Sequence, residues 1–195
     1  SINPDNGEMN IADDIITHRQ LMDIPLQQCD LDFTTCAHRY KKPASPHLAT
    51  KLSGETLDPD MITNATKRLQ SEYELVLLEG AGGLLVPITE NLLTLDYIAE
   101  QGCPIILVTS GRLGSINHTL LSLEAIKSRG LIVHSVIYNH IHDAAEQTDT
   151  EIANSTIEFL RKYLDNHYPE AHWLQIPYIK DNLVGNIEAL PANFV

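Results

Sequence analysis

Positive charge is scarce in this chain. Its 195 residues include 13 lysines and arginines against 26 aspartates and glutamates, so the formal net charge is -13 and the sequence pI is near 4.9. Such a surface repels polyanions, and we expect neither a nucleic-acid partner nor binding to an anionic membrane. A single nucleotide is not excluded, because a site for one anion is built locally from backbone N–H groups and a few cations.

Cysteines and long apolar runs are scarce as well. The three cysteines, Cys29, Cys36 and Cys103, are odd in number and form no CxxC pair, so the sequence favours a reducing, cytoplasmic location. No apolar run approaches the ~18 residues of a membrane-spanning helix. A chain of 195 residues that is 43% hydrophobic can bury one sizeable core, and we expect a single domain over 1–195.

Residues 75–87, LVLLEGAGGLLVP, are the most informative segment. The unbroken apolar run 75–78 is typical of a strand buried on both faces of a parallel sheet. Glu79 follows it, and then come four residues with almost no side-chain bulk, 80–83. A carboxylate at a strand end beside bare backbone can hold a cation and let a ligand approach closely. The simpler interpretation, a tight turn that needs glycine, stays open.

The rest of the chain alternates between strand and helix patterns. Repeats of this length predict right-handed crossovers and hence an α/β fold with a mostly parallel sheet. Residues 26–54 are expected to be mostly irregular, and Asp58-Pro59 is a good N-cap and first-turn pair. Helices are predicted over 13–22, 58–70, 93–101, 115–129 and 146–168, and strands over 75–78, 104–109, 131–138 and 173–176.

Ligands of such sheets bind beyond the carboxyl ends of the strands. The second predicted strand leads into the glycine-rich loop 110–114 and then a helix, where free N–H groups and the helix dipole favour an anion such as a carboxylate or phosphate. The alternative is that Ser115 is an ordinary N-cap. The third strand ends on Asn139, and the fourth is followed by Pro177 and Tyr178.

Together these segments resemble a known family. The order LVLLEGAGGLLVPI, PIILVTSGRLGSINHTLLSLEAIKSRGL, VIYNH and QIPYI, preceded by KPASPH at 42–47, is similar to dethiobiotin synthetase over nearly the whole chain. The resemblance implies a three-layer P-loop NTPase-type fold and a homodimer. It also implies closure of a ureido ring on 7,8-diaminopelargonate with CO2, ATP and Mg2+, giving dethiobiotin, ADP and phosphate.

The sequence departs from that family in one respect. Nothing of the form GxxxxGK[ST] occurs in it, so the P-loop strand and helix, with their phosphate-binding Lys, are not present in this chain. We expect the chain to be the C-terminal portion of a longer polypeptide and to be inactive by itself. The alternative is a protein of this fold that has lost catalysis. We assign no catalytic residue in this sequence.

The resemblance assigns the metal site to two carboxylates. Glu79 matches the family's Mg2+-binding acid, and Asp13 matches the second acid, with Asp14 as its competitor because the register is uncertain by one residue. Two carboxylates plus ATP oxygens fit magnesium, which takes few protein ligands. Without the resemblance, Asp13 is more simply a first-turn helix acid.

The resemblance also assigns the ligand contacts. Asn139 matches the residue that reads adenine, although a strand-end Asn also commonly caps a turn. The nucleotide would further contact Glu79, Gly80, Pro177 and Tyr178. The diamine would lie against Gly82 and Gly83, and its carboxylate would be held by Leu113, Gly114 and Asn117 across the dimer interface. His118 is interpreted as structural.

Two other functions are compatible with parts of the pattern. One is a P-loop ligase or amidotransferase of the cobyrinate-synthase type, which shares the EGAGx motif but is disfavoured by the GxINHxLL segment. The other is a non-catalytic regulatory module of the same fold. The sequence upstream of Ser1 would distinguish the latter from an enzyme.

Overall fold

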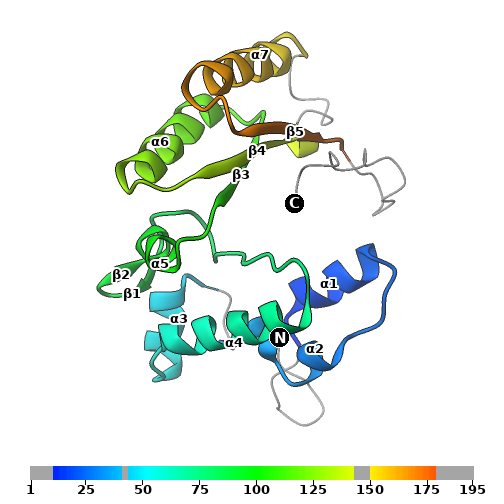
Figure 1. The fold of residues 1–195 in the computed structure, drawn as a ribbon, viewed down its shortest axis with the longest axis vertical. Helices are drawn as coiled ribbons and strands as arrows, with labels where there is room; N and C mark the ends of the chain where they lie inside the picture. The colour runs from blue at the N-terminus through cyan, green and yellow to red at the C-terminus, as the bar shows by residue number, and fades with distance from the viewer. Residues whose placement is uncertain (1–10, 41–43, 143–149, 179–195) are drawn as a thin grey trace. The chain divides into compact units, whose positions relative to one another are not determined.

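The computed structural model describes residues 11–40, 44–142 and 150–178. Within them the chain divides into two compact units, one up to Tyr97 and the other from Ile98 (Figure 1).

The first unit is mainly helical. The predicted helix at 13–22 is confirmed as α1 (Asp13–Leu21), and the one at 58–70 as α4 (Pro59–Glu72). As expected, the side chain of Asp58 caps α4, accepting a hydrogen bond of 3.0 Å from the N–H of Asp60. Helix α5 (Thr94–Gln101), which starts in this unit and runs across its boundary after Tyr97, also begins within one residue of its predicted start.

The prediction that residues 26–54 are mostly irregular is wrong. This part of the chain forms α2 (Gln28–Leu31), the 3-10 turn η1 (Thr34–Cys36) and α3 (Pro46–Ser53). Helix α3 has a proline at its first position and ends at Gly54, whose φ of 70° is left-handed. A proline at the first helical position and a left-handed glycine after the last one are ordinary signals of a helix start and a helix end. They were not recognised because the two prolines in residues 42–47 favoured an irregular turn.

The strand predicted at 75–78 is also wrong. The segment pairs with no strand among the described residues, and Leu75, Leu77 and Leu78 are 50%, 70% and 47% exposed. A parallel strand takes its hydrogen bonds from neighbouring strands, so an apolar run alone does not form one. The unit contains instead a short antiparallel hairpin of β1 (Pro87–Thr89) and β2 (Leu92–Leu93), which the sequence analysis missed.

A small core lies under this hairpin. Leu57, Ile88 and Tyr97 are buried together, with Ile62 and Leu92 packed against them. The hydroxyl groups of Tyr97 and Thr63 are 2.9 Å apart, which joins α5 to α4 by a hydrogen bond. The core therefore fixes the hairpin and the start of α5.

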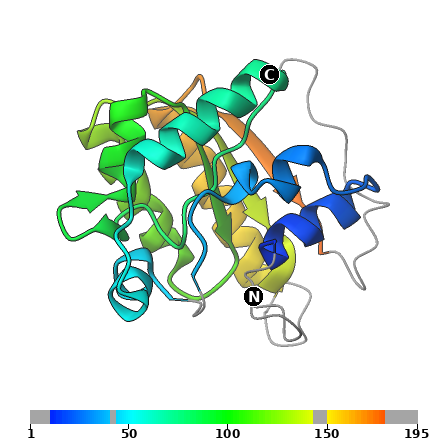
Figure 2. The same cartoon turned by 90° about the horizontal axis from the view of Figure 1, so that it is seen from below.

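The second unit is a parallel βαβαβ arrangement and confirms the predicted strand–helix alternation. Strands β3 (Ile105–Ser110), β4 (Val133–Asn139) and β5 (His172–Ile176) lie side by side in that order (Figures 1 and 2). The crossovers run through α6 (Ser115–Ser128) and α7 (Thr150–His167), with the 3-10 turn η2 (His140–His142) after β4.

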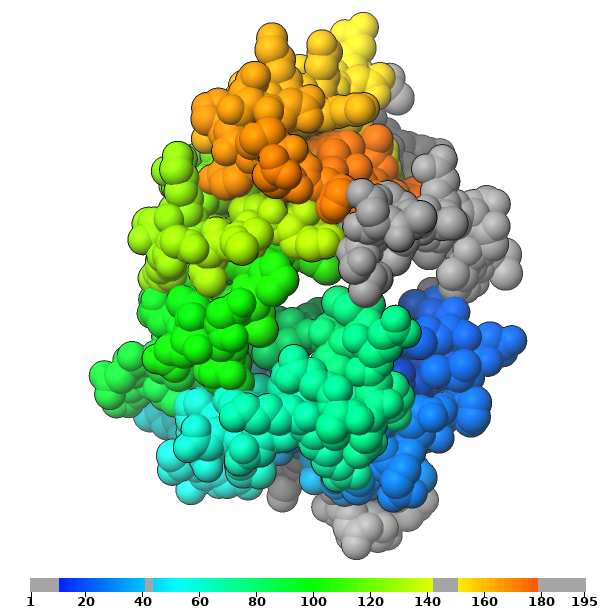
Figure 3. Space-filling model, in the orientation of Figure 1, coloured from blue at the N-terminus to red at the C-terminus, as the bar shows by residue number. Residues whose placement is uncertain are grey.

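Both crossover helices cover the same face of this sheet (Figure 1). The hydroxyl of Tyr168, just after α7, donates a hydrogen bond of 3.1 Å to the carbonyl of Leu123 in α6. The core holds Leu123 and Ile126 of α6, Val136 and Tyr138 of β4, and Leu160 and Leu164 of α7. In the space-filling view the atoms of α7 and β5 form a continuous surface (Figure 3).

Candidate functional site

The three parallel strands bring their carboxyl ends into register. Ser110 at the end of β3 pairs with Asn139 at the end of β4, and Asn139 pairs with Ile176 at the end of β5. The loop after β3, the turn after β4 and the segment 177–178 therefore start from one edge of the sheet. This is the edge where ligands of open α/β sheets bind.

The loop after β3 leads into a helix that no side chain caps. The N-cap residue of α6 is Gly114, with a left-handed φ of 89°. The N–H of Ser115 donates to the carbonyl of Arg112 at 2.9 Å, whereas the N–H groups of Ile116 and Asn117 have no acceptor among the described residues. Two N–H groups and the positive end of the helix dipole are thus available to an anion.

A hollow of about 260 Å³ opens beside this loop, between β3 and the start of α6. Its lining includes the guanidinium of Arg112, the imidazole of His118 and the hydroxyl groups of three serines: Ser110, Ser115 and Ser122. Of the residues predicted to bind the substrate carboxylate, Leu113 lines the hollow and is 99% exposed. Gly114 and Asn117 adjoin it in the chain, at the N-cap and in the first turn of α6, without lining it.

Sequence reasoning assigned no ligand contact to Arg112 or Ser115, both of which line the hollow, and interpreted His118 as structural. The signal that was available is the spacing in GRLGS, which places a cation three residues before a helix start. A Cβ atom at Gly114 would lie 3.5 Å from Nε2 of His118, so the imidazole packs over the glycine. That contact agrees with the structural interpretation of His118, although the ring also lines the hollow.

Two buried hydroxyl groups join β3 to α6 at the floor of the hollow. Oγ1 of Thr109 and Oγ1 of Thr119 are 2.6 Å apart, and the two residues are only 9% and 4% exposed. Because this hydrogen bond links the end of the strand to the second turn of the helix, it fixes the span that the loop 110–114 must bridge.

Asn139, the predicted adenine-reading residue, makes a turn contact. Its Oδ1 accepts a hydrogen bond of 3.0 Å from the N–H of Ile141. The simpler interpretation of this residue, a strand end that caps a turn, is therefore present in the structure. No hydrogen bond occupies its Nδ2 among the described residues, so the amide donor remains available to a ligand.

Pro177 and Tyr178 directly follow β5. Pro177 is half-buried and Tyr178 is 48% exposed. Beside them, Nε2 of His140 and Oε1 of Gln175 are 2.8 Å apart, which links the turn after β4 to β5. The same edge therefore carries all three residues assigned to the nucleotide base: Asn139, Pro177 and Tyr178.

The EGAGG segment lies in the first unit and is exposed. Gly82 has a φ of 92°, and a Cβ at Gly80 would lie 2.9 Å from the Thr94 methyl group, so both positions require glycine for the fold itself. At Gly83 an added Cβ would meet nothing within 4 Å. The simple turn interpretation thus explains why Gly80 and Gly82 are glycines. It does not explain Gly83, where the fold itself has room for a side chain.

Helix α5 anchors the end of this loop. Val86 and Leu84 offer their carbonyl groups to the N–H groups of Thr94 and Leu95 at 2.9 and 2.8 Å, and the Thr94 hydroxyl also donates to Val86 at 3.0 Å. These bonds satisfy N–H groups at the start of α5 that a helix cannot satisfy internally. The segment after Glu79 is therefore held in place at its far end.

The predicted metal acids are exposed carboxylates of the first unit. Asp13 and Asp14 occupy the first turn of α1, where Ala12 is the N-cap, and Glu79 follows the extended segment. Glu79 makes no hydrogen bond or ion pair within the described part of the chain, so its oxygens are open to a ligand. No group of three or more metal-ligating side chains occurs among the described residues, which is compatible with a cation held mainly by phosphate oxygens.

Comparison with known proteins places the chain in a class. The AAA domain family (AAA_26) matches residues 26–182. This match confirms the predicted fold class, an α/β domain of the P-loop NTPase type with a parallel sheet. None of the helices in the described ranges is long and apolar enough to cross a membrane.

Individual relatives define the family more narrowly. The chain is 48% identical over 157 residues to the ATP-dependent dethiobiotin synthetase BioD of Chlorobaculum tepidum, a match that covers 80% of the chain and 66% of that protein. It is 47% identical to BioD 2 of Pasteurella multocida (84% and 75%) and 52% identical to BioD 2 of Haemophilus influenzae (68% and 70%). The chain therefore belongs to the ATP-dependent dethiobiotin synthetase family, and spans about two thirds to three quarters of these relatives.

Proposed function

We propose that the protein closes the ureido ring of dethiobiotin from 7,8-diaminopelargonate, CO2 and ATP, releasing ADP and phosphate. The observation that carries the proposal is the 47% identity to a dethiobiotin synthetase over 84% of the chain. The uncapped start of α6 and the free amide donor of Asn139 support it, because the substrates are a carboxylate and a nucleotide. No observation favours a cobyrinate-type ligase or a regulatory module.

The reaction needs no protein nucleophile. One substrate amine captures CO2 as a carbamate, and a carbamate oxygen attacks the γ-phosphorus of ATP with release of ADP. The second amine then attacks the carbonyl carbon of the mixed anhydride, and phosphate leaves as the ring closes. The work of the protein is to position the reactants and to neutralise charge.

Glu79 and Asp13, or Asp14 in its place, are the residues that would hold Mg2+. Their carboxylates suit a hard cation that keeps most of its ligands from water and phosphate. When bound, Mg2+ supplies neutralisation of charge on the phosphate oxygens. The role of this chain is then to present two acids of one unit, with Glu79 unpaired among the described residues.

The nucleotide base is assigned to the carboxyl edge of the second unit. Nδ2 of Asn139 would donate to the adenine, and the backbone of Pro177 and Tyr178 would line it. Gly80 and Glu79 would lie toward the phosphates. Asn139 is chosen for this role because it ends a strand and its Nδ2 donates no hydrogen bond among the described residues.

The substrate carboxylate is assigned to the start of α6. The free N–H groups of Ile116 and Asn117 follow Leu113 and Gly114 there, and Leu113 is almost entirely exposed. We propose that this loop serves the active site of a second copy in a homodimer, while Gly82 and Gly83 contact the diamine. A cytoplasmic location is part of the same proposal.

Genetic complementation tests the proposed function. A bacterial strain that lacks its own dethiobiotin synthetase grows without biotin only if the expressed full-length protein makes dethiobiotin. We expect growth without supplement for the wild type. Growth on added dethiobiotin is the control that the rest of the pathway works. Failure to grow despite normal amounts of folded protein contradicts the proposal.

A further inference from the structure

We infer that His140 and Gln175 are positioning residues that make the nucleotide site prefer adenine over guanine. The inference rests on the proposed function, which assigns the base to Asn139, and goes beyond it by naming two residues that act through this amide. Nε2 of His140 and Oε1 of Gln175 are 2.8 Å apart. Because the amide oxygen only accepts, the imidazole N–H donates, and this His140–Gln175 bridge ties the turn after β4 to β5.

The amide of Asn139 is held in one orientation. Its Oδ1 lies 3.0 Å from the N–H of Ile141. Because a backbone N–H only donates, the amide atom that faces it must be the oxygen, and the donor Nδ2 points away from it. An amide that rotated by half a turn would exchange the places of donor and acceptor. The N–H of Ile141 therefore determines which groups of Asn139 meet the base.

The turn that carries this N–H is fastened through His140. The turn, η2, has only three residues, and Ile141 within it is 52% exposed. The His140 ring stands edge-on to the fully buried ring of Tyr138, with centroids 4.9 Å apart and an angle of 71° between the planes. Its Nε2 is bonded to Gln175 of the next strand. The imidazole thus connects the turn to the core and to β5.

The bridge lies one step from the edge that receives the base. Gln175 pairs with Tyr138 in the parallel ladder, and the next pair joins Asn139 to Ile176, the last residue of β5. Residues 177–178, whose backbone is assigned to the base, follow directly. The bridge therefore fixes the spacing between the Asn139 amide and the second half of the base site.

A fixed amide orientation distinguishes the two purines. Adenine presents an acceptor at N7 and a donor at N6, and an asparagine amide pairs with both at once. The Asn139 oxygen has two lone pairs, so it can accept from N6 while it accepts from Ile141, and Nδ2 donates to N7. Guanine presents acceptors at both N7 and O6, so its O6 would oppose the amide oxygen. Only a rotated amide would accommodate guanine, and the bridge opposes that rotation by holding the Ile141 N–H in place.

Calorimetric titration of the full-length protein with ATP and with GTP tests the inference, because it measures binding without turnover. Wild type should bind ATP more tightly than GTP. His140→Ala and Gln175→Ala should each lower the ratio of the GTP to the ATP dissociation constant about fivefold, since one hydrogen bond between neutral groups is lost. His167→Ala is the matched control and should leave the ratio unchanged, because its Nδ1 lies 2.9 Å from the Tyr163 carbonyl oxygen in α7.

Two further variants distinguish positioning from general damage. Gln175→Glu keeps an acceptor oxygen for His140 and should retain the wild-type ratio, since the added negative charge weakens both nucleotides alike. In protein that already carries Asn139→Ala, His140→Ala should lower the ratio no further, because the amide through which it acts is gone.

The outcomes separate this inference from the proposed function. A wild type that binds both nucleotides equally, a ratio that the two alanine variants leave unchanged, or an equal fall without the Asn139 amide overturns the inference. Formation of dethiobiotin by the same protein is measured separately. A protein that shows the predicted ratios but forms no dethiobiotin contradicts the proposed function alone, and one that forms dethiobiotin without them contradicts the bridge alone.

Discussion

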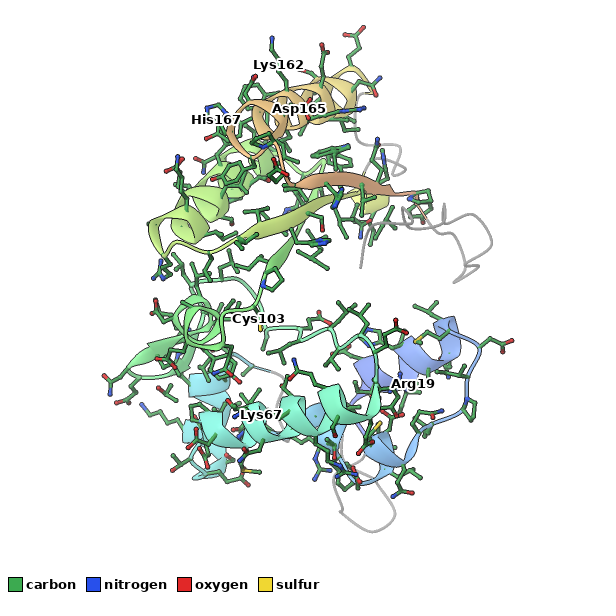
Figure 4. The ribbon with its side chains drawn as sticks, in the orientation of Figure 1. Arg19, Lys67, Cys103, Lys162, Asp165 and His167 are labelled. Atoms are coloured by element: carbon green, nitrogen blue, oxygen red, sulfur yellow. The ribbon has the colours of Figure 1, made fainter. Side chains whose placement is uncertain are left out.

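The guanidinium of Arg19 holds the carboxylate of Asp30 through two parallel hydrogen bonds, Nε to Oδ2 at 2.8 Å and Nη2 to Oδ1 at 2.9 Å. Asp30 is completely buried, and its Oδ2 also accepts from the N–H of Gln27 at 2.7 Å. Arg19 reaches from α1 toward α2 (Figure 4). This pair therefore joins the helix that carries the predicted metal acid Asp13 to the rest of its unit.

Removing the cation should be costly. Arg19→Met leaves a buried carboxylate without its counter-ion, and we expect the free energy of unfolding to fall by about 3–5 kcal/mol. Urea denaturation measures it. The control is Arg68→Met, which breaks the exposed pair between Arg68 and Asp32 at 2.7 Å and should cost far less. Equal losses in the two variants would contradict the importance of burial.

The same pair predicts acid sensitivity. Burial alone would raise the pKa of the Asp30 carboxyl, but hydrogen bonds from Arg19 and from the Gln27 N–H outweigh it and hold that pKa below its ordinary value. The resulting stabilisation is complete above the unfolded pKa of about 3.9, and is lost as the pH falls through the lower folded value. Urea unfolding between pH 5 and 2 should show this loss in wild type and a shallower one in Asp30→Asn; identical slopes would refute it.

The hydroxyl pair of Thr109 and Thr119 is suited to a double-mutant cycle. Thr109→Val or Thr119→Val leaves one buried hydroxyl without a partner and should cost about 1–3 kcal/mol of unfolding free energy. The double variant replaces both hydroxyls by methyl groups and should recover much of that loss. Strict additivity of the two single losses would show that the 2.6 Å contact does not couple β3 to α6.

Two neighbouring glycines separate folding from ligand contact. Gly82→Ala forces a side chain into a left-handed backbone and toward Val86, so we expect a stability loss of about 1–2 kcal/mol. Gly83→Ala meets no protein atom and should leave the melting temperature unchanged. If the diamine lies against this backbone, Gly83→Ala raises its KM. An unchanged KM would remove Gly83 from the substrate site.

The second unit was predictable from the sequence because its local signals agree with one another. Apolar runs of strand length alternate with a helix that begins after Gly114 and ends before Gly130, both of which have positive φ. The carboxyl-edge site follows from this order alone, since parallel strands align their ends. The assignment of Asn139 and of the loop 110–114 to that edge needed no contact information.

The features that the sequence did not predict depend on contacts between residues that are separated in the chain. The run 75–78 has the composition of a buried strand, yet strand formation depends on neighbouring strands that composition does not reveal. The pair of Arg19 and Asp30 links positions eleven apart on two helices and leaves no periodic signal. The sequence allowed Ser115 to be the N-cap of α6, and only the backbone conformation shows that Gly114, with its left-handed φ of 89°, takes that place.

The formation of dethiobiotin by the purified full-length protein tests the central claim most directly. With 7,8-diaminopelargonate, bicarbonate, ATP and Mg2+, mass spectrometry should detect one dethiobiotin for each ADP released. The reaction should stop when Mg2+ is chelated. Glu79→Gln should keep the wild-type melting temperature, because Glu79 is exposed, while turnover at ordinary Mg2+ is lost. A wild-type protein that hydrolyses ATP without forming dethiobiotin, or that works equally well as Glu79→Gln, would contradict the account.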